Sequence, residues 1–202
     1  MTDSNLKTKL MLGILAVLLF LVMHFSTNYL AKIRNTKRCL KSRWDDRLPF
    51  VPSMVYFYLF TYIFNSVCLF FLIYDKPLKE FIIVVKIIIT LIITGSLFYI
   101  IMPTRIIKPQ LESKNISLRL LKAHNDNILP YNAFPSLHVA FSIITVLVAF
   151  HFDSQLKIYY LIILILIAIS ALLTKQHYII DIIAGAVLGS IIFIFFLLRY
   201  NL

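Results

Sequence analysis

The sequence predicts an all-α, polytopic membrane protein, built as a six-transmembrane-helix bundle in a single domain. Of its 202 residues, 60% are apolar and only 14% are charged, whereas soluble domains are about 45–50% apolar and about 25% charged. The mean hydropathy of +0.88 indicates the same class. Six apolar stretches also approach or exceed the roughly 20 residues that a membrane-spanning helix needs.

The six predicted spans follow one another without an internal repeat or a low-complexity linker. The first is long and follows two lysines, the second encloses Cys68, and the third contains Lys86, whose long side chain is expected to snorkel. The fourth and fifth are short, and the last carries a stripe of small residues. They lie near Leu10–Ala31, Met54–Tyr74, Phe81–Met102, Ser136–Phe152, Lys157–Thr174 and Tyr178–Tyr200.

Alternation of six spans places three connections on one side of the membrane: Lys32–Ser53, Pro103–Pro135 and the short turn Lys175–His177. The segments that carry His138 and His177 therefore face the same compartment. The loop Pro103–Pro135 contains a stretch at 116–122 that is typical of a short interfacial helix.

The formal net charge of +11 suits a protein that borders anionic lipid headgroups or handles an anionic substrate. Nucleic acid is not expected as a partner, because the basic residues occupy short loops between apolar runs. Cys39 and Cys68 form neither a disulfide framework nor a metal motif. The expected partners are the bilayer and a phosphorylated lipid, and the oligomeric state is left open.

Two helix faces predict where the polar side chains meet. His177, Asp181, Gly185 and Gly189 recur every four residues on one face of the last span, a small-xxx-small pattern that permits close helix packing. In the fourth span, a second face carries His138, Ser142, Thr145 and Ala149. Both faces are expected to point into the bundle, which brings the two histidines together.

These residue types indicate phosphoryl chemistry. A carboxylate at Asp181 can fix one tautomer of His177 and leave the other ring nitrogen as a nucleophile. A second imidazole, His138, can protonate a departing alkoxide.

A phosphate group also needs positive charge and hydrogen-bond donors around its oxygens. Arg105, Lys108 and Lys175 lie on the histidine side of the membrane, and arginine suits bidentate phosphate binding best. Ser136, at the start of a helix, adds a hydroxyl and nearby backbone N–H groups. His24, His124 and His151 are interpreted as interfacial residues outside the site.

The motifs resemble those of the type 2 phosphatidic acid phosphatase superfamily, whose members are six-helix membrane enzymes that form a phosphohistidine. Pro135, Ser136 and His138 match the Pro-Ser-x-His motif, and His177 and Asp181 match the His-x-x-x-Asp motif. The resemblance implies that His177 is the nucleophile, Asp181 its orienting partner and His138 the general acid. It implies no cofactor and no metal.

Two family features are absent from the sequence. Ala171 stands where the third motif usually has arginine, and only Pro103–Arg105 and Lys108–Pro109 occupy the place of the first motif. The Pro-Ser-Leu-His form and the segment 46–52 are similar to the branch containing inositol phosphorylceramide synthases.

Three readings of the function follow. The first is a metal-independent lipid phosphatase, the second a phospho-headgroup transferase of the sphingolipid-synthase kind, and the third a non-catalytic lipid-binding or transport protein. A metal hydrolase is disfavoured, because Asp181 is the one carboxylate expected near the two histidines.

The membrane side of the site has conflicting signals. Of the 20 Lys and Arg residues, 13 fall on the histidine side and 7 on the other, which favours the cytoplasm. The family resemblance instead favours the outer leaflet or the lumen. A multi-pass location in a bacterial cell or inner membrane is expected, with the sidedness open.

Overall fold

The computed structural model describes residues 3–74, 76–112, 115–152 and 155–200. Regular structure within these ranges is helical, so the predicted all-α class is confirmed. The elements are α1 (Asp3–Ile33), α2 (Arg43–Arg47), the 3-10 helix η1 (Pro52–Met54), α3 (Val55–Tyr74), α4 (Leu78–Ile101), α5 (Ile116–Asn127), α6 (Leu137–Phe152), α7 (Lys157–Leu173) and α8 (Ile179–Tyr200).

Each of the six predicted spans corresponds to one long helix, namely α1, α3, α4, α6, α7 or α8. Three of the helices within the described ranges are long and apolar enough to cross a membrane: α1 from Asn5, α4 and α8. Helices α6 and α7 are apolar but shorter, with 16 and 17 residues. The structure therefore supports an integral membrane protein, while the count of six spans stays a prediction.

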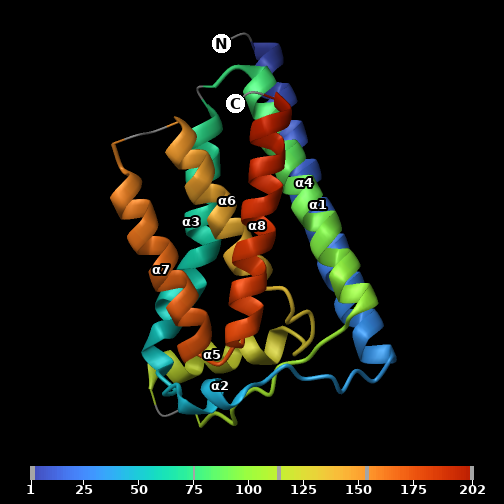
Figure 1. The fold of residues 1–202 in the computed structure, drawn as a ribbon, viewed down its shortest axis with the longest axis vertical. Coiled ribbons are helices and arrows are strands. Elements are labelled where there is room, and N and C mark those ends of the chain that lie inside the picture. The colour runs from blue at the N-terminus through green and yellow to red at the C-terminus, as the bar shows by residue number, and fades with distance from the viewer. Residues whose placement is uncertain (1–2, 75, 113–114, 153–154, 201–202) are drawn as a thin grey trace.

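Helices α2 and α5 and the turn between α7 and α8 gather at one end of the bundle, and the beginning of α1 and the end of α8 lie at the other (Figure 1). Helix α5 contains the predicted interfacial stretch and continues beyond it to Asn127. It begins at a side-chain cap, because the Oδ1 atom of Asn115 accepts the N–H of Leu118 at 2.9 Å.

The core of the bundle lies between α4, α6 and α8, whose buried apolar residues recur about every four positions along each helix. These include Ile83, Ile87 and Leu91 of α4, Ala140, Ile144 and Val148 of α6, and Ile192, Phe193 and Phe196 of α8. Outside this core, α1 packs mainly against α4, whereas α3 packs against α6 and α7.

Helix α8 approaches the beginning of α6 so closely that only glycine fits at two positions. A Cβ atom on Gly185 would overlap the carbonyl oxygen of Ser136, and one on Gly189 would lie 2.7 Å from the carbonyl oxygen of Ala140. The small residues of the last span thus let the two helices that carry His138 and Asp181 come together.

Candidate active site

The turn between α7 and α8 places His177 at the end of the bundle where α2 and α5 lie. Lys175 has a left-handed φ of 57°, which reverses the chain directly after α7. The backbone N–H of His177 then donates to the carbonyl oxygen of Ala171 at 3.1 Å. His177 is 6% exposed, so its ring is held among other residues rather than in solvent.

Two carboxylates cap the N-terminus of α8, directly after His177. The Oδ2 atom of Asp181 accepts the N–H of Tyr178 at 2.8 Å, and the Oδ1 atom of Asp45 accepts the N–H of Ile179 at 2.8 Å. Both N–H groups would otherwise lack a helical partner. Asp45 belongs to α2, so this short helix is tied to the turn that carries His177.

The hydrogen bonds around Asp45 lower the pKa of its carboxyl group. Burial raises the pKa of this carboxyl, but hydrogen bonds from Ser42 and Ile179 and the charge of Lys175 outweigh burial and hold it below its ordinary value. Asp45 is therefore a carboxylate at neutral pH, which is the form that caps α8 best.

The ring of His177 has two neighbours on the side of its Nδ1 atom. The carbonyl oxygen of Ala133 lies 3.1 Å from Nδ1, and the Oδ2 atom of Asp181 lies 3.7 Å away. A carbonyl oxygen only accepts, so Nδ1 carries the hydrogen and Nε2 keeps its lone pair. The sequence assigned this orienting role to Asp181, whereas here the Ala133 carbonyl lies closer.

Asp181 is fully buried between α6 and α8. Its Oδ1 atom has no hydrogen-bond partner within the described part of the chain, and its backbone carbonyl accepts the N–H of Ser136 at 2.9 Å. A buried carboxylate oxygen without a donor is costly. Asp181 thus places a buried carboxyl group close to the ring of His177.

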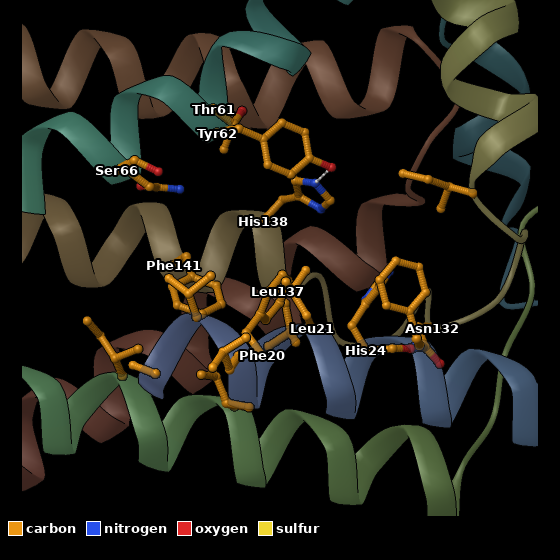
Figure 2. Close-up of a pocket in the computed structure, with 18 of the residues that line it drawn as sticks. Phe20, Leu21, His24, Thr61, Tyr62, Ser66, Asn132, Leu137, His138 and Phe141 are labelled. Carbon is orange, nitrogen blue, oxygen red and sulfur yellow. Dashed lines mark hydrogen bonds between the residues drawn. The ribbon is translucent and has the colours of Figure 1, made fainter. Parts of the chain in front are cut away.

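His138 lies in the first turn of α6, and its ring centroid is 5.7 Å from that of His177. Its Nε2 atom lies 2.8 Å from the hydroxyl of Tyr62 and 3.3 Å from that of Tyr58, both on α3. Figure 2 shows Tyr62 pointing from α3 directly at the His138 ring. Helix α6 and the turn before α8 therefore bring the two imidazoles together. The tyrosine hydroxyls of α3 orient the His138 ring.

Helix α5 contributes a third histidine, which the sequence had placed at the interface. The ring of His124 packs 5.2 Å from that of Tyr58, and His124 lines the same cavity as His138 and His177. Burial lowers the pKa of His124 to about 4, and the nearby charge of Lys108 acts in the same direction. His124 is therefore neutral at pH 7.

Of the three predicted phosphate-binding cations, Lys108 lines this cavity. Its ammonium donates to the carbonyl oxygen of Ile128 at 2.8 Å and to that of Asn125 at 3.5 Å. Burial lowers the pKa of Lys108 to about 8, although the charge of Asp126 acts in the opposite direction. The ammonium therefore remains the major form at pH 7.

The other predicted phosphate-binding residues lie elsewhere. The Lys175 ammonium donates to the carbonyl oxygens of Asp45 at 3.0 Å and Leu48 at 2.7 Å, so it ties the turn to α2. Ser136 is fully buried, and its hydroxyl oxygen accepts the N–H of Val139 at 3.4 Å. Arg105 pairs through its backbone with Tyr131 and Arg38. None of the three is among the cavity-lining residues.

The cavity has a volume of about 1000 Å³ and lies between α1 and α3, and residues of α4 and α6 also line it (Figure 2). One end is polar and holds the histidines, and the remainder is lined mainly by apolar side chains. The described lining residues include no Asp or Glu. Such a cavity suits an anionic headgroup attached to a hydrocarbon chain.

The described residues include no group of three or more His, Cys, Asp or Glu side chains able to hold a metal ion. The metal independence expected from the sequence remains a prediction, because an activity measurement with a chelator is what tests it.

Sequence reasoning missed Tyr58, Tyr62, His24 and His124, all of which line the cavity. A signal for the tyrosines was present, because Tyr58, Thr61, Tyr62 and Asn65 follow one face of the predicted second span. His124 carried no comparable signal, since its position depends on how the loop before α6 folds back over the bundle.

Comparison with known proteins adds one match. Residues 43–195 match the family model described as the PAP2 superfamily, which covers both histidine motifs. No curated protein and no solved structure matches the chain significantly.

Proposed function

Because the chain belongs to the PAP2 superfamily, we propose that it is a membrane-embedded lipid phosphatase acting through a phosphohistidine intermediate. Members of this superfamily are generally phosphatases or phosphotransferases, which supports the reading of the chain as a phosphatase-type lipid phosphoesterase. The proposed substrate is a lipid phosphate monoester or a lipid diphosphate. The observation that carries the proposal is the approach of His138 and His177 at the polar end of a cavity that is otherwise apolar.

In the first proposed step, the Nε2 lone pair of His177 attacks the phosphorus atom. An N–P bond forms while the bond between phosphorus and the lipid oxygen breaks, and protonated His138 gives its proton to that oxygen. The carbonyl of Ala133 holds the Nδ1 hydrogen of His177, and the nearby carboxylate of Asp181 stabilises the positive charge that develops on this ring.

In the second proposed step, water replaces the histidine on phosphorus. His138, now neutral, takes a proton from the attacking water, the N–P bond breaks, and inorganic phosphate leaves. The hydroxyls of Tyr58 and Tyr62 hold one nitrogen of His138 throughout, so the other nitrogen carries the transferred proton.

Lys108 is the proposed partner of the phosphate oxygens, because its ammonium lines the cavity at the histidine end. To bind phosphate, it exchanges the carbonyl oxygens of Ile128 and Asn125 for an anionic ligand, which is a stronger acceptor. Arg105 and Lys175 remain proposals for the same role, and Lys175 has to leave two carbonyl oxygens to fill it.

The test is phosphate release by the purified protein from a panel of lipids, with and without a chelator. The panel holds phosphatidate, phosphatidylglycerophosphate, a polyprenyl diphosphate, a lipid A phosphate and phosphoinositides. We expect release that resists the chelator and is inhibited by vanadate. His177→Ala is expected to abolish it, and His138→Ala to lower it about 10²–10⁴-fold.

The matched control is His151→Ala, because His151 lies on α6 like His138 but at its other end. It should retain full turnover. Full turnover in His177→Ala would end the proposal, as would a wild-type protein that binds these lipids without any phosphorus chemistry, which would instead support the lipid-binding or transport reading.

A phospho-headgroup transferase is the second candidate. Polar side chains of Thr61, Asn65 and Ser66 line the cavity beside Tyr62, and such groups suit the hydroxyl of a lipid acceptor. Incubation with a headgroup-labelled lipid, with and without an alcohol acceptor, separates the two reactions. Label in a new lipid indicates transfer, whereas free phosphate indicates hydrolysis.

A further inference from the structure

The apolar part of the cavity forms a groove along α1 that extends far from the histidines. We define this chain groove by its α1 wall, where Lys9, Gly13, Val17, Leu21 and His24 line the cavity at spacings of three or four residues. Helix α4 forms its floor through side chains such as Val85, Ile88 and Ile92. The residues from Lys9 to His24 therefore present one continuous face to the groove.

The chain groove is longer than one leaflet of a bilayer is deep. Lys9 and His24 are separated by 15 residues, or about 22 Å along a helix that rises 1.5 Å per residue. The hydrocarbon core of a bilayer is about 30 Å thick, so one leaflet is about 15 Å deep. A chain that starts at the histidines and fills the groove thus passes the middle of the membrane.

The groove is open on its lipid-facing side. Ile14 and Val17 of α1 are 59% and 58% exposed, and Phe70 of α3 is 50% exposed, although all three line the cavity. Helix α1 packs mainly on α4 and α3 mainly on α6 and α7, so the opening lies between α1 and α3. Apolar side chains along an opening of this kind match a hydrocarbon chain that enters sideways from the bilayer.

The far end of the groove is closed around Lys9, one turn short of Leu6, where the α1 lining ends. This side chain is 4% exposed, and its ammonium donates to the backbone carbonyl oxygens of Tyr74 and Lys76. Its position over the ring of Phe81, 5.8 Å from the centroid, joins α1 to the beginning of α4. The groove therefore has a definite length, from the histidines to this closure.

Gly13 lines the groove one helical turn from Lys9, and its lack of a side chain leaves space there. A Cβ atom built on Gly13 meets nothing within 4 Å, in contrast to Gly185 and Gly189, which are in tight contact with α6. Helix packing therefore does not require glycine at this position, which lines the groove. Gly13 lies 11 residues from His24, or about 16 Å along the helix.

We propose that the chain groove binds the hydrocarbon chain of the phosphorylated lipid, and that Gly13 allows chains that extend past the membrane midplane. The proposal rests on the function proposed above, because the histidine end receives the phosphate. Charge supports this occupant, because the Lys108 ammonium lines that end beside four histidines and the described lining carries no carboxylate.

The test compares octyl and octadecyl monophosphate as substrates of the purified protein. An octyl chain ends before the level of Gly13, whereas an octadecyl chain passes it. We expect the wild type to have at least tenfold higher kcat/KM for the octadecyl ester. Gly13→Phe should remove this preference by lowering kcat/KM for the octadecyl ester toward that for the octyl ester.

Two further variants keep the result interpretable. Leu15→Phe places the same phenylalanine ring at an exposed position of α1 that does not line the cavity, and it should leave the preference unchanged. Gly13→Leu fills the groove less and should give an intermediate preference. It also serves if Gly13→Phe fails to insert, since leucine favours a helix more than glycine does.

Binding of octyl and octadecyl phosphonate, measured by native mass spectrometry, distinguishes failure of this inference from failure of the proposed function. Loss of the octadecyl preference in Gly13→Phe supports the groove even if the wild type releases no phosphate. An unchanged preference in Gly13→Phe and Gly13→Leu, by turnover or by binding, overturns the inference and leaves the phosphatase proposal intact. Equal binding of both chains to the wild type also overturns it.

Discussion

Replacing Asp45 with alanine tests whether α2 positions the turn that carries His177. Asp45 is 3% exposed, and its Oδ1 atom accepts the N–H of Ile179 at 2.8 Å. Its Oδ2 atom accepts the N–H and the hydroxyl of Ser42 at 2.7 and 2.6 Å. Asp45→Ala removes all three hydrogen bonds and leaves the N–H of Ile179 without its cap.

The expected loss follows from these contacts. A hydrogen bond to a charged group contributes about 1.5–3 kcal/mol, and loss of an N-cap costs about 0.5–2 kcal/mol. Because the bonds share one carboxylate and are not additive, we expect the free energy of unfolding to fall by roughly 2–4 kcal/mol. Turnover should fall at least tenfold, since His177 precedes the helix start that Asp45 caps.

The assay combines unfolding in detergent with phosphate release at temperatures where both proteins are folded. Asp46→Ala is the matched control, because Asp46 is the next residue, its side chain is 63% exposed, and it pairs with Lys41 at the surface. Such a solvent-exposed pair contributes little to stability. The reasoning is refuted if Asp45→Ala matches Asp46→Ala in both stability and turnover.

The pH dependence of unfolding gives an independent check on Asp45. Its pKa in the folded state is below the ordinary value of about 3.9, so its contribution is complete at neutral pH. The contribution disappears as the pH falls through the folded-state pKa. The wild type should therefore lose its advantage over Asp45→Ala in acid, and an advantage that persists unchanged under strongly acidic conditions contradicts this account.

Two more predictions concern the cavity and the helix contact behind it. The KM for a lipid phosphate should rise above pH 8, because the pKa of Lys108 is about 8 and the neutral amine binds an anion poorly. In Lys108→Arg this rise should move to higher pH. An identical pH profile in the two proteins argues against phosphate binding by Lys108. Gly185→Ala should cost about 1–3 kcal/mol in unfolding free energy and reduce phosphate release, because its methyl group meets the Ser136 carbonyl. Gly13→Ala, which meets nothing, is the control, and equal stability of the two variants would contradict the packing argument.

Much of the bundle was predictable because the relevant patterns are local. Apolar runs marked the long helices, and four-residue spacing placed Asp181, Gly185 and Gly189 on one face of the last span with a repeat that permits close packing. His177, predicted on the same face, lies instead in the turn before α8. The structure brings that face against α6 and sets the His138 and His177 rings 5.7 Å apart. The charge pattern also predicted an anionic partner, although the lipid itself is still to be measured.

Only the tertiary structure decided which groups surround the histidines. It placed the Ala133 carbonyl, rather than the Asp181 carboxylate, at hydrogen-bond distance from His177. It also directed the Lys175 ammonium to carbonyl oxygens near α2, and it brought His124 into the cavity. These contacts join segments separated by 44 to 134 positions, as with Ala133 and His177 or Asp45 and Ile179.

The sequence by itself determined that this chain is a helical membrane protein with two histidine motifs on facing helices. Periodicity within a helix is a property of neighbouring residues, so it can be read along the chain. The paths of the loops, the partners of the lysines and the groove along α1 depend on how distant segments pack. No local pattern specifies those contacts, and for this reason they became visible only in the folded chain.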